Sequence, residues 1–335
     1  MTQPPHIAIV GATGAVGREM LSCIAEQELP FSQLTLLSSA RSAGKTITFR
    51  GEELVVEKLT AEAFAGVDIA FFAAGGGISE EFAAHAAAAG AVVIDNSSAF
   101  RMDPEVPLIV PEINPEAVRS LPKGIIANPN CTTIISLMAL APLHRAFGLK
   151  SIIASSYQAV SGSGAAGIVE LDSQINALAN GGDIQKEVYP HQIASNVIPH
   201  VDVFEEGGYT KEEHKMFNEA RKILALPDLK VTSTCVRVPV HRSHSVSISA
   251  QFEKPVTVEA ARAVYGDSTP GVILCDDPEE ALYPTPLDTS GKDDCLVGRI
   301  RMDRVLDNAL ALWVVGDQVK KGAALNSVQI AQLLR

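Results

Sequence analysis

Residues 6–17 read HIAIVGATGAVG, and this stretch decides the fold of the N-terminal part of the chain. HIAIV is a short apolar run that ends directly in a glycine, and a helical pattern follows the last glycine. A buried strand, a glycine-rich turn and a helix in this order are typical of the first βα unit of a nucleotide-binding domain. The glycines allow a tight turn and the approach of a pyrophosphate to the helix N-terminus, although GxxGxxG is not the strict GxGxxG fingerprint.

Further short apolar runs follow this first unit, and helical stretches such as residues 79–90 separate some of them. We interpret four of these runs as buried strands: LTLLS at 34–38, VDIAFFAA at 67–74, AVVID at 91–95 and GIIAN at 124–128. Strands that alternate with helices form a parallel, doubly wound sheet that is covered on both faces. We therefore expect a Rossmann-type domain over residues 1–130.

The pattern of apolar and polar residues changes after residue 130. Residues 231–252 alternate apolar and polar side chains, as strands with one solvated or interface face do. Amphipathic helical patterns surround this region at 165–180, 209–226 and 257–265. We expect an α+β second domain with a mostly antiparallel sheet over residues 131–315, followed by a C-terminal helical segment, 316–335, that packs back on the first domain.

The composition is that of an ordinary globular protein, with 335 residues, 47% hydrophobic and 20% charged, and a formal net charge of −12. This length favours two domains, and the negative charge argues against nucleic acid as a partner. No apolar run approaches the ~18 residues of a membrane span, and the N-terminus lacks a signal-peptide pattern. The five cysteines are scattered and contain no CxxC pair, so we expect a cytoplasmic protein with unpaired thiols and no metal site. Because the net charge disfavours nucleic acid, we expect small-molecule ligands.

The end of the second predicted strand bears on the choice of cofactor. A site for NAD usually places Asp or Glu there to bind the ribose 2′-hydroxyl. LTLLSSARSAGK instead offers Ser38, Ser39, Arg41 and Ser42, and no acid. Hydroxyls and a guanidinium suit the 2′-phosphate of NADP, which predicts NADP over NAD, while the alternative interpretation is a solvated surface loop.

Cys131 stands in NPNCTT (128–133), directly before a long apolar run. Asn130 can cap the following helix, which would place Cys131 in its first turn, where unpaired amides and the helix dipole favour a thiolate. The alternative is a buried and inert cysteine, which is the more common case. The other four cysteines lie in apolar or strand patterns or, at 295, beside acids, so Cys131 is the candidate nucleophile.

A nucleophile needs a partner for its proton, and the histidines of RVPVHRSHS (237–245) are candidates. His241 and His244 follow a predicted strand, with Arg237 and Arg242 nearby. A metal site at these histidines is a weak interpretation, because residues three apart on a strand face opposite sides and no third ligand accompanies them. The residues alone therefore give candidates for the general base and do not identify which histidine it is.

Eight separated motifs carry a resemblance over nearly the whole chain. They are GATGAVG (11–17), SSARSAGK (38–45), DNSSAFRMD (95–103), NPNCTT (128–133), SYQAVSGSG (156–164), EEHKM (212–216), RVPVHRSHS (237–245) and GAALNSVQI (322–330). In this order they make the chain similar to the aspartate-β-semialdehyde dehydrogenases of the shorter bacterial type. The segment HRS departs from the pattern of many relatives, so His241 remains a second imidazole close to the expected base.

The resemblance implies a role for each matching residue. Cys131 would be the nucleophile, His244 the general base, and Gln158 the residue that orients the substrate. Arg237 would bind the substrate carboxylate, and Glu212 its amine. The resemblance also implies a phosphate site of Asn96, Ser98, Arg101 and Lys215, and an NADP site of Gly11, Thr13, Gly14, Ala15, Val16, Ser38, Arg41, Ser42, Ser161, Gly162 and Gln318.

The implied reaction is the NADPH-dependent reduction of L-4-aspartyl phosphate to L-aspartate-4-semialdehyde and phosphate through a cysteine thioester. It would serve the biosynthesis of lysine, methionine, threonine and diaminopimelate. Relatives form homodimers through their second domains, so a homodimer is expected. The closest enzymatic alternative is N-acetyl-γ-glutamyl-phosphate reductase. From another class, the alternative is a non-catalytic nucleotide-binding regulator with Cys131 as a redox sensor.

Without the resemblance, the charged residues of EEHKM have a simpler interpretation. Thr210 and Glu213 predict a capping box that opens an amphipathic helix. Glu212 and Lys215 then belong to a surface ladder of ion pairs, which is worth little in stability. The resemblance replaces that interpretation for Glu212 and Lys215 only.

Overall fold

The computed structural model describes residues 3–266 and 269–335. The chain divides into two compact units, and each is described by itself. The first unit comprises the residues up to Asn130 together with Ala323–Arg335, and the second comprises Cys131–Gly322. None of the helices in the described residues has both the length and the hydrophobicity that crossing a membrane requires.

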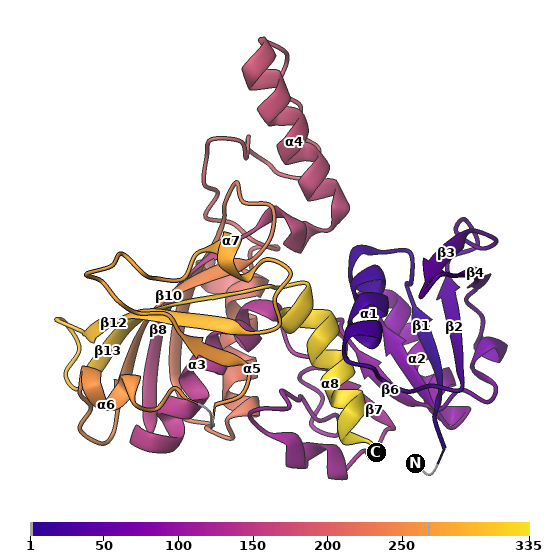
Figure 1. The fold of residues 1–335 in the computed structure, drawn as a ribbon, viewed down its shortest axis with the longest axis horizontal. Helices are drawn as coiled ribbons and strands as arrows, with labels where there is room; N and C mark the ends of the chain where they lie inside the picture. The colour runs from indigo at the N-terminus through magenta and orange to yellow at the C-terminus, as the bar shows by residue number, and fades with distance from the viewer. Residues whose placement is uncertain (1–2, 267–268) are drawn as a thin grey trace. The chain divides into compact units, whose positions relative to one another are not determined.

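The first unit is built on a seven-stranded sheet with the order β3-β4-β2-β1-β5-β6-β7 (Figure 1). All neighbouring strands pair in parallel except β3 and β4, which form an antiparallel hairpin at one edge. The strands are β1 His6–Val10, β2 Gln33–Ser38, β3 Thr46–Phe49, β4 Glu52–Lys58, β5 Ile69–Phe72, β6 Val92–Asp95 and β7 Ile125–Ala127. The Rossmann-type parallel sheet expected from the sequence is confirmed, and the edge hairpin is an addition to it.

Three helices cover this sheet: α1 Ala15–Glu26, α2 Gly76–Ala88 and α8 Leu325–Leu333. The C-terminal helix α8 contacts both α1 and β6, and α2 packs on β6 from behind the sheet (Figure 1). Side chains such as Ile9, Met20, Phe71 and Val328 form one buried cluster between the sheet and the helices α1 and α8. Because Val328 and its neighbours in α8 belong to this cluster, α8 is part of the core of this unit. Burial of one such side chain stabilises the fold by about 1.5–3 kcal/mol.

The glycine-rich turn after β1 is tightly packed. Gly11 has a φ of +83°, and a Cβ there would lie 2.6 Å from the carbonyl oxygen of Ala73, which follows β5. A Cβ at Gly17 would lie 2.3 Å from the carbonyl oxygen of Gly11 and 2.7 Å from the Cα of Ala12. The first glycine therefore allows the turn itself, and the third allows α1 to approach the strand.

The second unit is built on a six-stranded mixed sheet with the order β11-β12-β13-β10-β8-β9. Its central pairings are antiparallel, whereas β8 and β9, and β11 and β12, pair in parallel. The strands are β8 Leu149–Gln158, β9 Lys230–Arg237, β10 His244–Phe252, β11 Val272–Leu274, β12 Cys295–Met302 and β13 Ala309–Gly316. The α+β character expected from the sequence is confirmed.

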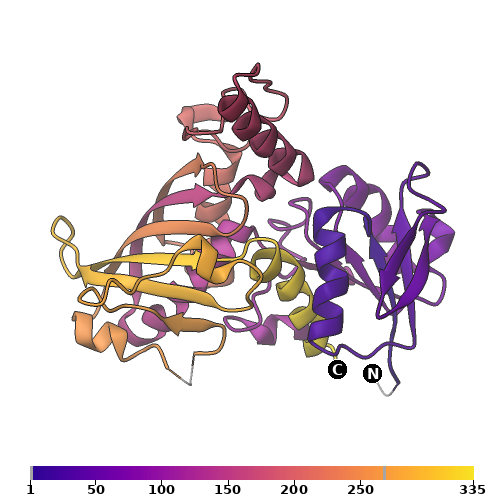
Figure 2. The same cartoon turned by 45° about the horizontal axis from the view of Figure 1, so that its top comes forward.

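The second unit contains five α-helices in the described residues. They are α3 Cys131–Phe147, α4 Ala165–Asn180, α5 Lys211–Ile223, α6 Val258–Arg262 and α7 Pro286–Thr289. The helix α3 contacts β8, β10, β12 and β13, and every residue from Thr132 to Leu143 is buried. The helix α4 projects away from this sheet (Figures 1 and 2), anchored by a small core of Leu171, Val160 and Tyr189.

The other face of the second sheet carries a different set of residues. Ile153 and Tyr157 of β8 point to it, as do Ser247 and Ser249 of β10 and Trp313 of β13, which the register places side by side. We call this surface the open face. Its mixture of hydroxyls and exposed apolar groups is typical of an interface.

Replacement of Gly17 by alanine should destabilise the first unit. The added methyl group meets backbone atoms that cannot rotate away, so α1 must shift, at a cost of about 1–3 kcal/mol. Gly77→Ala is the matched control, because Gly77 lies in α2 and a Cβ there meets nothing within 4 Å. Urea unfolding monitored by circular dichroism compares the two variants, and equal midpoints would contradict the packing argument.

Candidate active site

Three predicted site residues lie at the same edge of the second sheet. Gln158 is the last residue of β8 and pairs in register with Arg237, the last residue of β9. His244 is the first residue of the antiparallel strand β10, whose next residue pairs with Tyr157. The ends of β8 and β9 and the start of β10 therefore meet, and all three side chains are buried.

Gln158 connects this edge to the helix that begins with Cys131. Its Nε2 donates to Oγ1 of Thr132 at 2.9 Å and to Oε1 of Glu212 at 3.0 Å. Cys131 is half-buried at the first position of α3, as expected from the sequence. A Cβ at Gly322 would lie 2.7 Å from the Cβ of Cys131, so the backbone at 322 closely approaches the cysteine.

Arg237 and His244 are both held by the backbone of one residue, Ala159, which follows β8. Nη1 of Arg237 donates to the carbonyl oxygen of Ala159 at 2.8 Å, and the amide of Ala159 donates to Nδ1 of His244 at 3.1 Å. A Cβ at Gly162 would lie 2.8 Å from Nη1 of Arg237 and 3.2 Å from Cε1 of His244. The absence of a side chain at 162 therefore leaves room beside both groups.

The electrostatic surroundings of His244 favour its neutral form. Burial, with the guanidinium of Arg237 as a second cause, lowers the pKa of His244 to about 3, although the carboxylate of Glu212 acts in the opposite direction. Nδ1 accepts a hydrogen bond, so the proton of the neutral ring is on Nε2. Within the described residues, Nε2 is buried and has no hydrogen-bond partner.

A cluster of charges adjoins Gln158. Nζ of Lys215 lies 2.9 Å from Oε2 of Glu212 and 2.8 Å from Oδ2 of Asp202. Burial disfavours the ammonium, but the two carboxylates outweigh it and raise the pKa of Lys215. Lys215 is therefore a cation throughout the neutral range of pH.

The helix that carries Glu212 and Lys215 begins as expected. The capping box predicted at Thr210 and Glu213 is confirmed, with the amide of Thr210 donating to Oε2 of Glu213 at 2.7 Å and the amide of Glu213 donating to Oγ1 of Thr210 at 3.4 Å. Glu212 and Lys215 follow in the first turns of α5. The cap therefore fixes where the charged face of α5 starts.

His241 does not belong to the cluster at Arg237. Its Nε2 lies 2.7 Å from Oδ1 of Asp172 on α4, and both side chains are about half exposed, each at 53%. His244, in contrast, is buried beside Arg237. Of the two histidines that the sequence shortlisted, His244 is the one at the sheet edge with Gln158.

Three predicted cofactor residues of the second unit gather in one network. The side chain of Gln318 donates to Oγ of Ser161 and accepts from the amide of Ser243 at 2.8 Å. The preceding residue, Asp317, is fully buried and accepts from Nε of Arg242 and from the amide of Gly291. Asp317 thus holds the loop that leads to His244. Gly162 follows Ser161 directly in the sequence.

The remaining predicted cofactor residues lie in the first unit. Oγ1 of Thr13 lies 3.1 Å from Oγ of Ser38, which joins the glycine turn to the end of β2. Ala15 and Val16 begin α1, Ser42 is buried, and Arg41 is exposed. The turn and the end of β2 therefore face one another, as a dinucleotide site at the carboxyl ends of the strands requires.

The phosphate residues predicted in the first unit differ in their surroundings. Arg101 is buried and donates from Nε to the carbonyl oxygen of Asn128 at 2.9 Å and from Nη2 to that of Asn96 at 2.8 Å. The side chain of Asn96 donates to the carbonyl oxygen of Phe72 and accepts from Ser327. Ser98 is exposed. Arg101 and Asn96 are thus brought together, with the backbone of Asn96 holding the guanidinium.

Two family descriptions match the chain: "Semialdehyde dehydrogenase, NAD binding domain" over residues 6–121 and "Semialdehyde dehydrogenase, dimerisation domain" over residues 140–321. The aspartate-semialdehyde dehydrogenase of Aquifex aeolicus is 52% identical over 332 residues, which cover 98% of this chain and 97% of that protein. The chain belongs to the aspartate-semialdehyde dehydrogenase family.

Solved structures of this family share the fold over the whole chain. Aspartate semialdehyde dehydrogenase II of Vibrio cholerae, crystallised in complex with ASA, has a TM-score of 0.96 and 45% identity, covering 99% of this chain and 98% of that one. The enzyme of Candida albicans, solved with NADP, has a TM-score of 0.78 and 26% identity, covering 99% and 98%.

Sequence reasoning missed several residues that shape the candidate active site of this family member. Thr132 bonds to Gln158 and the amide of Ala159 bonds to His244, while Asp317 holds the side chain of Arg242 in the loop before His244. Asp202 pairs with Lys215 across 13 positions of sequence. Thr132 adjoins Cys131 and could have been suspected, but no local pattern singles out Asp202 or Asp317.

The other cysteines have surroundings that differ from those of Cys131. All five lie in the described part of the chain, and no disulfide joins them. Cys23, Cys235 and Cys295 are buried. Burial, followed by the charge of Glu212, raises the pKa of Cys235 to about 12, which makes it a poor nucleophile. No group of three or more His, Cys, Asp or Glu side chains in residues 3–266 and 269–335 is arranged to hold a metal ion.

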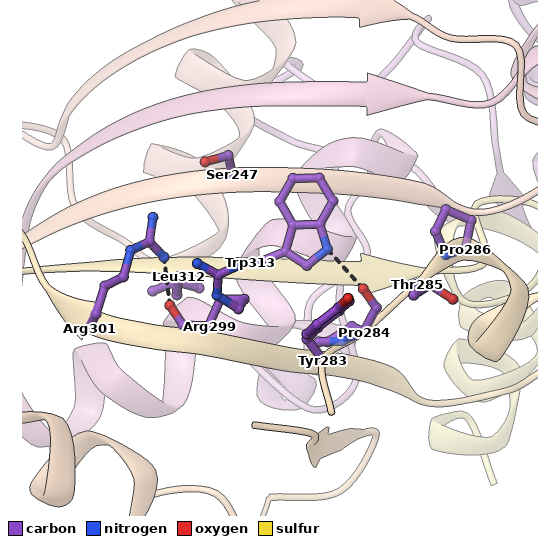
Figure 3. Close-up of a pocket in the computed structure, with 9 residues that line it drawn as sticks. All are labelled: Ser247, Tyr283, Pro284, Thr285, Pro286, Arg299, Arg301, Leu312 and Trp313. Carbon is purple, nitrogen blue, oxygen red and sulfur yellow. Dashed lines mark hydrogen bonds between the residues drawn. The ribbon is translucent and has the colours of Figure 1, made fainter. Parts of the chain in front are cut away.

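A pocket of about 370 Å³ lies on the open face, and none of the predicted site residues lines it (Figure 3). Trp313 forms one side and donates from Nε1 to the carbonyl oxygen of Pro284 at 3.1 Å. The other lining residues include Tyr283, Arg299 and Arg301. The pocket therefore belongs to the open face and not to the sheet edge that carries Gln158, Arg237 and His244.

The state of His244 can be tested by NMR. We expect the neutral ring, with its proton on Nε2, to persist from pH 5.5 to 8, because burial and Arg237 disfavour the imidazolium. Nitrogen chemical shifts of ¹⁵N-histidine-labelled protein report both the charge and the tautomer. The His244→Asn variant assigns the resonance, and a ring that becomes charged near pH 6.5 would contradict the expectation.

Proposed function

We propose that this chain is a phosphorylating, NADP-dependent aspartate-semialdehyde dehydrogenase. In the biosynthetic direction it reduces L-4-aspartyl phosphate to L-aspartate-4-semialdehyde and releases phosphate. The single observation that carries the proposal is the meeting of Gln158, Arg237 and His244 at one sheet edge, with Gln158 bonded to the first turn of the helix that Cys131 begins. Membership of the family supports the substrate class, since its curated members carry that name.

Cys131 opens the proposed reaction. Its thiolate attacks the acyl carbon of aspartyl phosphate, a C–S bond forms, and the C–O bond to the phosphoryl group breaks, so that a thioester and phosphate result. The N-terminus of α3 stabilises the thiolate through its amides and dipole. Gln158 is held by Thr132 and Glu212 and orients the acyl group beside the sulfur.

The thioester is then reduced. NADPH, when bound, supplies a hydride to the thioester carbonyl carbon. His244 donates from Nε2–H to the oxygen that gains negative charge, as an oxyanion donor does. Re-formation of the carbonyl breaks the C–S bond, which releases the aldehyde and restores the thiolate of Cys131. This sequence requires no base on the enzyme.

The role proposed for His244 differs from the general base expected from the sequence. A base must present an unprotonated nitrogen to the substrate. The amide of Ala159 occupies the lone pair of Nδ1, which leaves the proton on Nε2. A neutral imidazole held in this tautomer favours donation to an oxyanion over acceptance of a proton.

Arg237 and Glu212 supply substrate selection in this proposal. The guanidinium of Arg237 can form two parallel hydrogen bonds to the α-carboxylate. The buried carboxylate of Glu212 attracts the free ammonium of the substrate. In the second unit, Lys215 supplies the ammonium that binds phosphate in this proposal. The resemblance assigns a part in phosphate binding to Arg101, Asn96 and Ser98 of the first unit as well.

NADP is the proposed cofactor because the residues fit it. The glycine turn admits a pyrophosphate, since Gly11 and Gly17 leave no side chain between the strand and α1. The segment after β2 offers a hydroxyl and a guanidinium at Ser42 and Arg41 and no carboxylate. A family member of Candida albicans was solved with NADP. Within the second unit, Ser161, Gly162 and Gln318 complete the proposed set.

A reducing compartment suits this chemistry. A nucleophilic thiolate would be lost by oxidation, and the five cysteines form no disulfide in the described residues. We therefore propose that the enzyme works in the cytoplasm.

We propose that the open face pairs two copies of the chain. The matching family description of this unit is a dimerisation domain. Ile153 and Tyr157 are 47% and 38% exposed on an otherwise well-packed sheet, and Tyr157 lies 5.4 Å from Trp313 between ring centroids. Aromatic and aliphatic groups surrounded by hydroxyls are suited to self-association.

The reaction is tested by following NADP reduction with L-aspartate-4-semialdehyde, with and without phosphate. We expect turnover that requires phosphate and that Cys131→Ala lowers by more than about 10³-fold, because the covalent route is lost. Cys275→Ala is the control, since this half-buried thiol has no proposed role. Turnover that ignores phosphate would contradict the phosphorylating reaction, and activity with only N-acetyl-glutamate-5-semialdehyde would indicate the other reductase.

The dimer is tested with Ile153→Glu. A charge on the open face should convert dimers to monomers, since two copies would bring like charges together in a desolvated interface. Val305→Glu is the control, because Val305 is 89% exposed in the β12–β13 connection. Sedimentation velocity measures the mass, and an unchanged dimer in Ile153→Glu would rule out the open face as the interface.

A further inference from the structure

Lys215, the residue proposed to hold phosphate, lies between two carboxylates of different character. Glu212 is buried and is also bonded to Gln158, so it is fixed within the catalytic edge. Asp202 has an exposed fraction of 31% for its side chain, against 18% for Lys215 and 6% for Glu212. Asp202 is therefore the carboxylate on the solvent side of the ammonium.

The backbone holds Asp202 in place. Its φ of +67° is in the left-handed region, and its Oδ1 accepts from the amide of Val203 at 2.9 Å. The preceding segment pairs with Arg237, because the amides of Ile198 and Arg237 donate to each other's carbonyl oxygens at 2.9 and 2.8 Å. The amide of Lys211 donates to the carbonyl oxygen of Val203 at 2.8 Å. A non-glycine residue in this backbone conformation is uncommon and is maintained only where its surroundings hold it.

The two carboxylates compete with any incoming anion for the ammonium of Lys215. One ammonium and two carboxylates sum to −1, and Oδ2 of Asp202 lies within hydrogen-bond distance of Nζ at 2.8 Å. A phosphoryl group that binds Lys215 must replace one carboxylate or share the ammonium with both. Glu212 is tied to Gln158, so the exposed Asp202 is the one that an incoming anion displaces.

We propose that Asp202 is a positioning residue that sets the affinity of Lys215 for phosphate. It acts through Lys215 as a counter-ion that phosphate, or the phosphoryl group of the substrate, must displace. The inference rests on the proposed function, because it takes Lys215 as part of the phosphate site. Asp202 thereby holds the ammonium in place when the site is empty and weakens phosphate binding.

The test is the dependence of aldehyde oxidation on phosphate concentration, at constant ionic strength, in Asp202→Asn. The amide keeps the shape and can still accept from Val203, but it no longer competes as a charge for Lys215. We expect the KM for phosphate to fall about three- to tenfold, as loss of a partly exposed ion pair allows. The kcat and the KM for semialdehyde should stay within about twofold.

Two further variants sharpen the test. Asp202→Gly removes the same charge and suits the left-handed backbone, so it should lower the KM for phosphate even if the asparagine variant folds poorly. Glu205→Gln is the matched control, since Glu205 is on the same segment and pairs with His214 at 3.7 Å rather than with Lys215. If removal of any negative charge near the site is enough, Glu205→Gln will lower the KM for phosphate as much as Asp202→Asn does. That result would overturn the proposal.

The outcomes separate this inference from the proposed function. Damage to the fold raises KM values or lowers kcat, so a selective gain in phosphate affinity supports the specific role of Asp202. An unchanged or higher KM for phosphate in both Asp202 variants overturns it. Wild-type turnover that does not depend on phosphate overturns the phosphorylating function itself, and the role of Asp202 with it.

Discussion

The backbone of Ala159 is the constraint on which the arrangement of Gln158, Arg237 and His244 depends. Its carbonyl oxygen accepts from Arg237, and its amide donates to His244. A backbone peptide cannot change protonation state, so it fixes the tautomer of the imidazole as well as its position. The carbonyl also orients the guanidinium without neutralising it. The two backbone groups of this one residue, directly after β8, thus set the tautomer of His244 and the direction of Arg237.

The space around this edge is as important as its hydrogen bonds. Gly162 lies against Arg237 and His244, and Gly322 lies against Cys131, so closely that a side chain at either position would displace its neighbour. In the first unit, the missing side chain at Gly17 likewise lets α1 pack closely against the glycine turn. In each case the missing Cβ lets the backbone approach a neighbouring group closely. The residues with proposed chemical roles therefore depend on glycines that have no chemistry of their own.

The sequence predicted best those features that local physical chemistry determines. The strand at 6–10, the glycine turn and the capping box at Thr210 depend on residues close in the chain, and they are found where expected. The antiparallel β3–β4 hairpin was missed because its short strands carry many exposed polar residues. Asp202 and Ala159 were missed because their roles come from partners 13 and 78–85 positions away. Such contacts leave no local pattern.

The two cations of the second unit show how a partner decides what a charge can do. Arg237 is held by a carbonyl oxygen, which directs the guanidinium but leaves its full charge for a substrate carboxylate. Lys215 is held by two carboxylates, which keep it protonated and at the same time compete with any anion for it. A site that must bind and later release an anion benefits from a cation held between carboxylates. When the anion leaves, the carboxylates neutralise the cation again. Under the proposed function, these two kinds of partner would make the site hold the carboxylate strongly and phosphate more weakly.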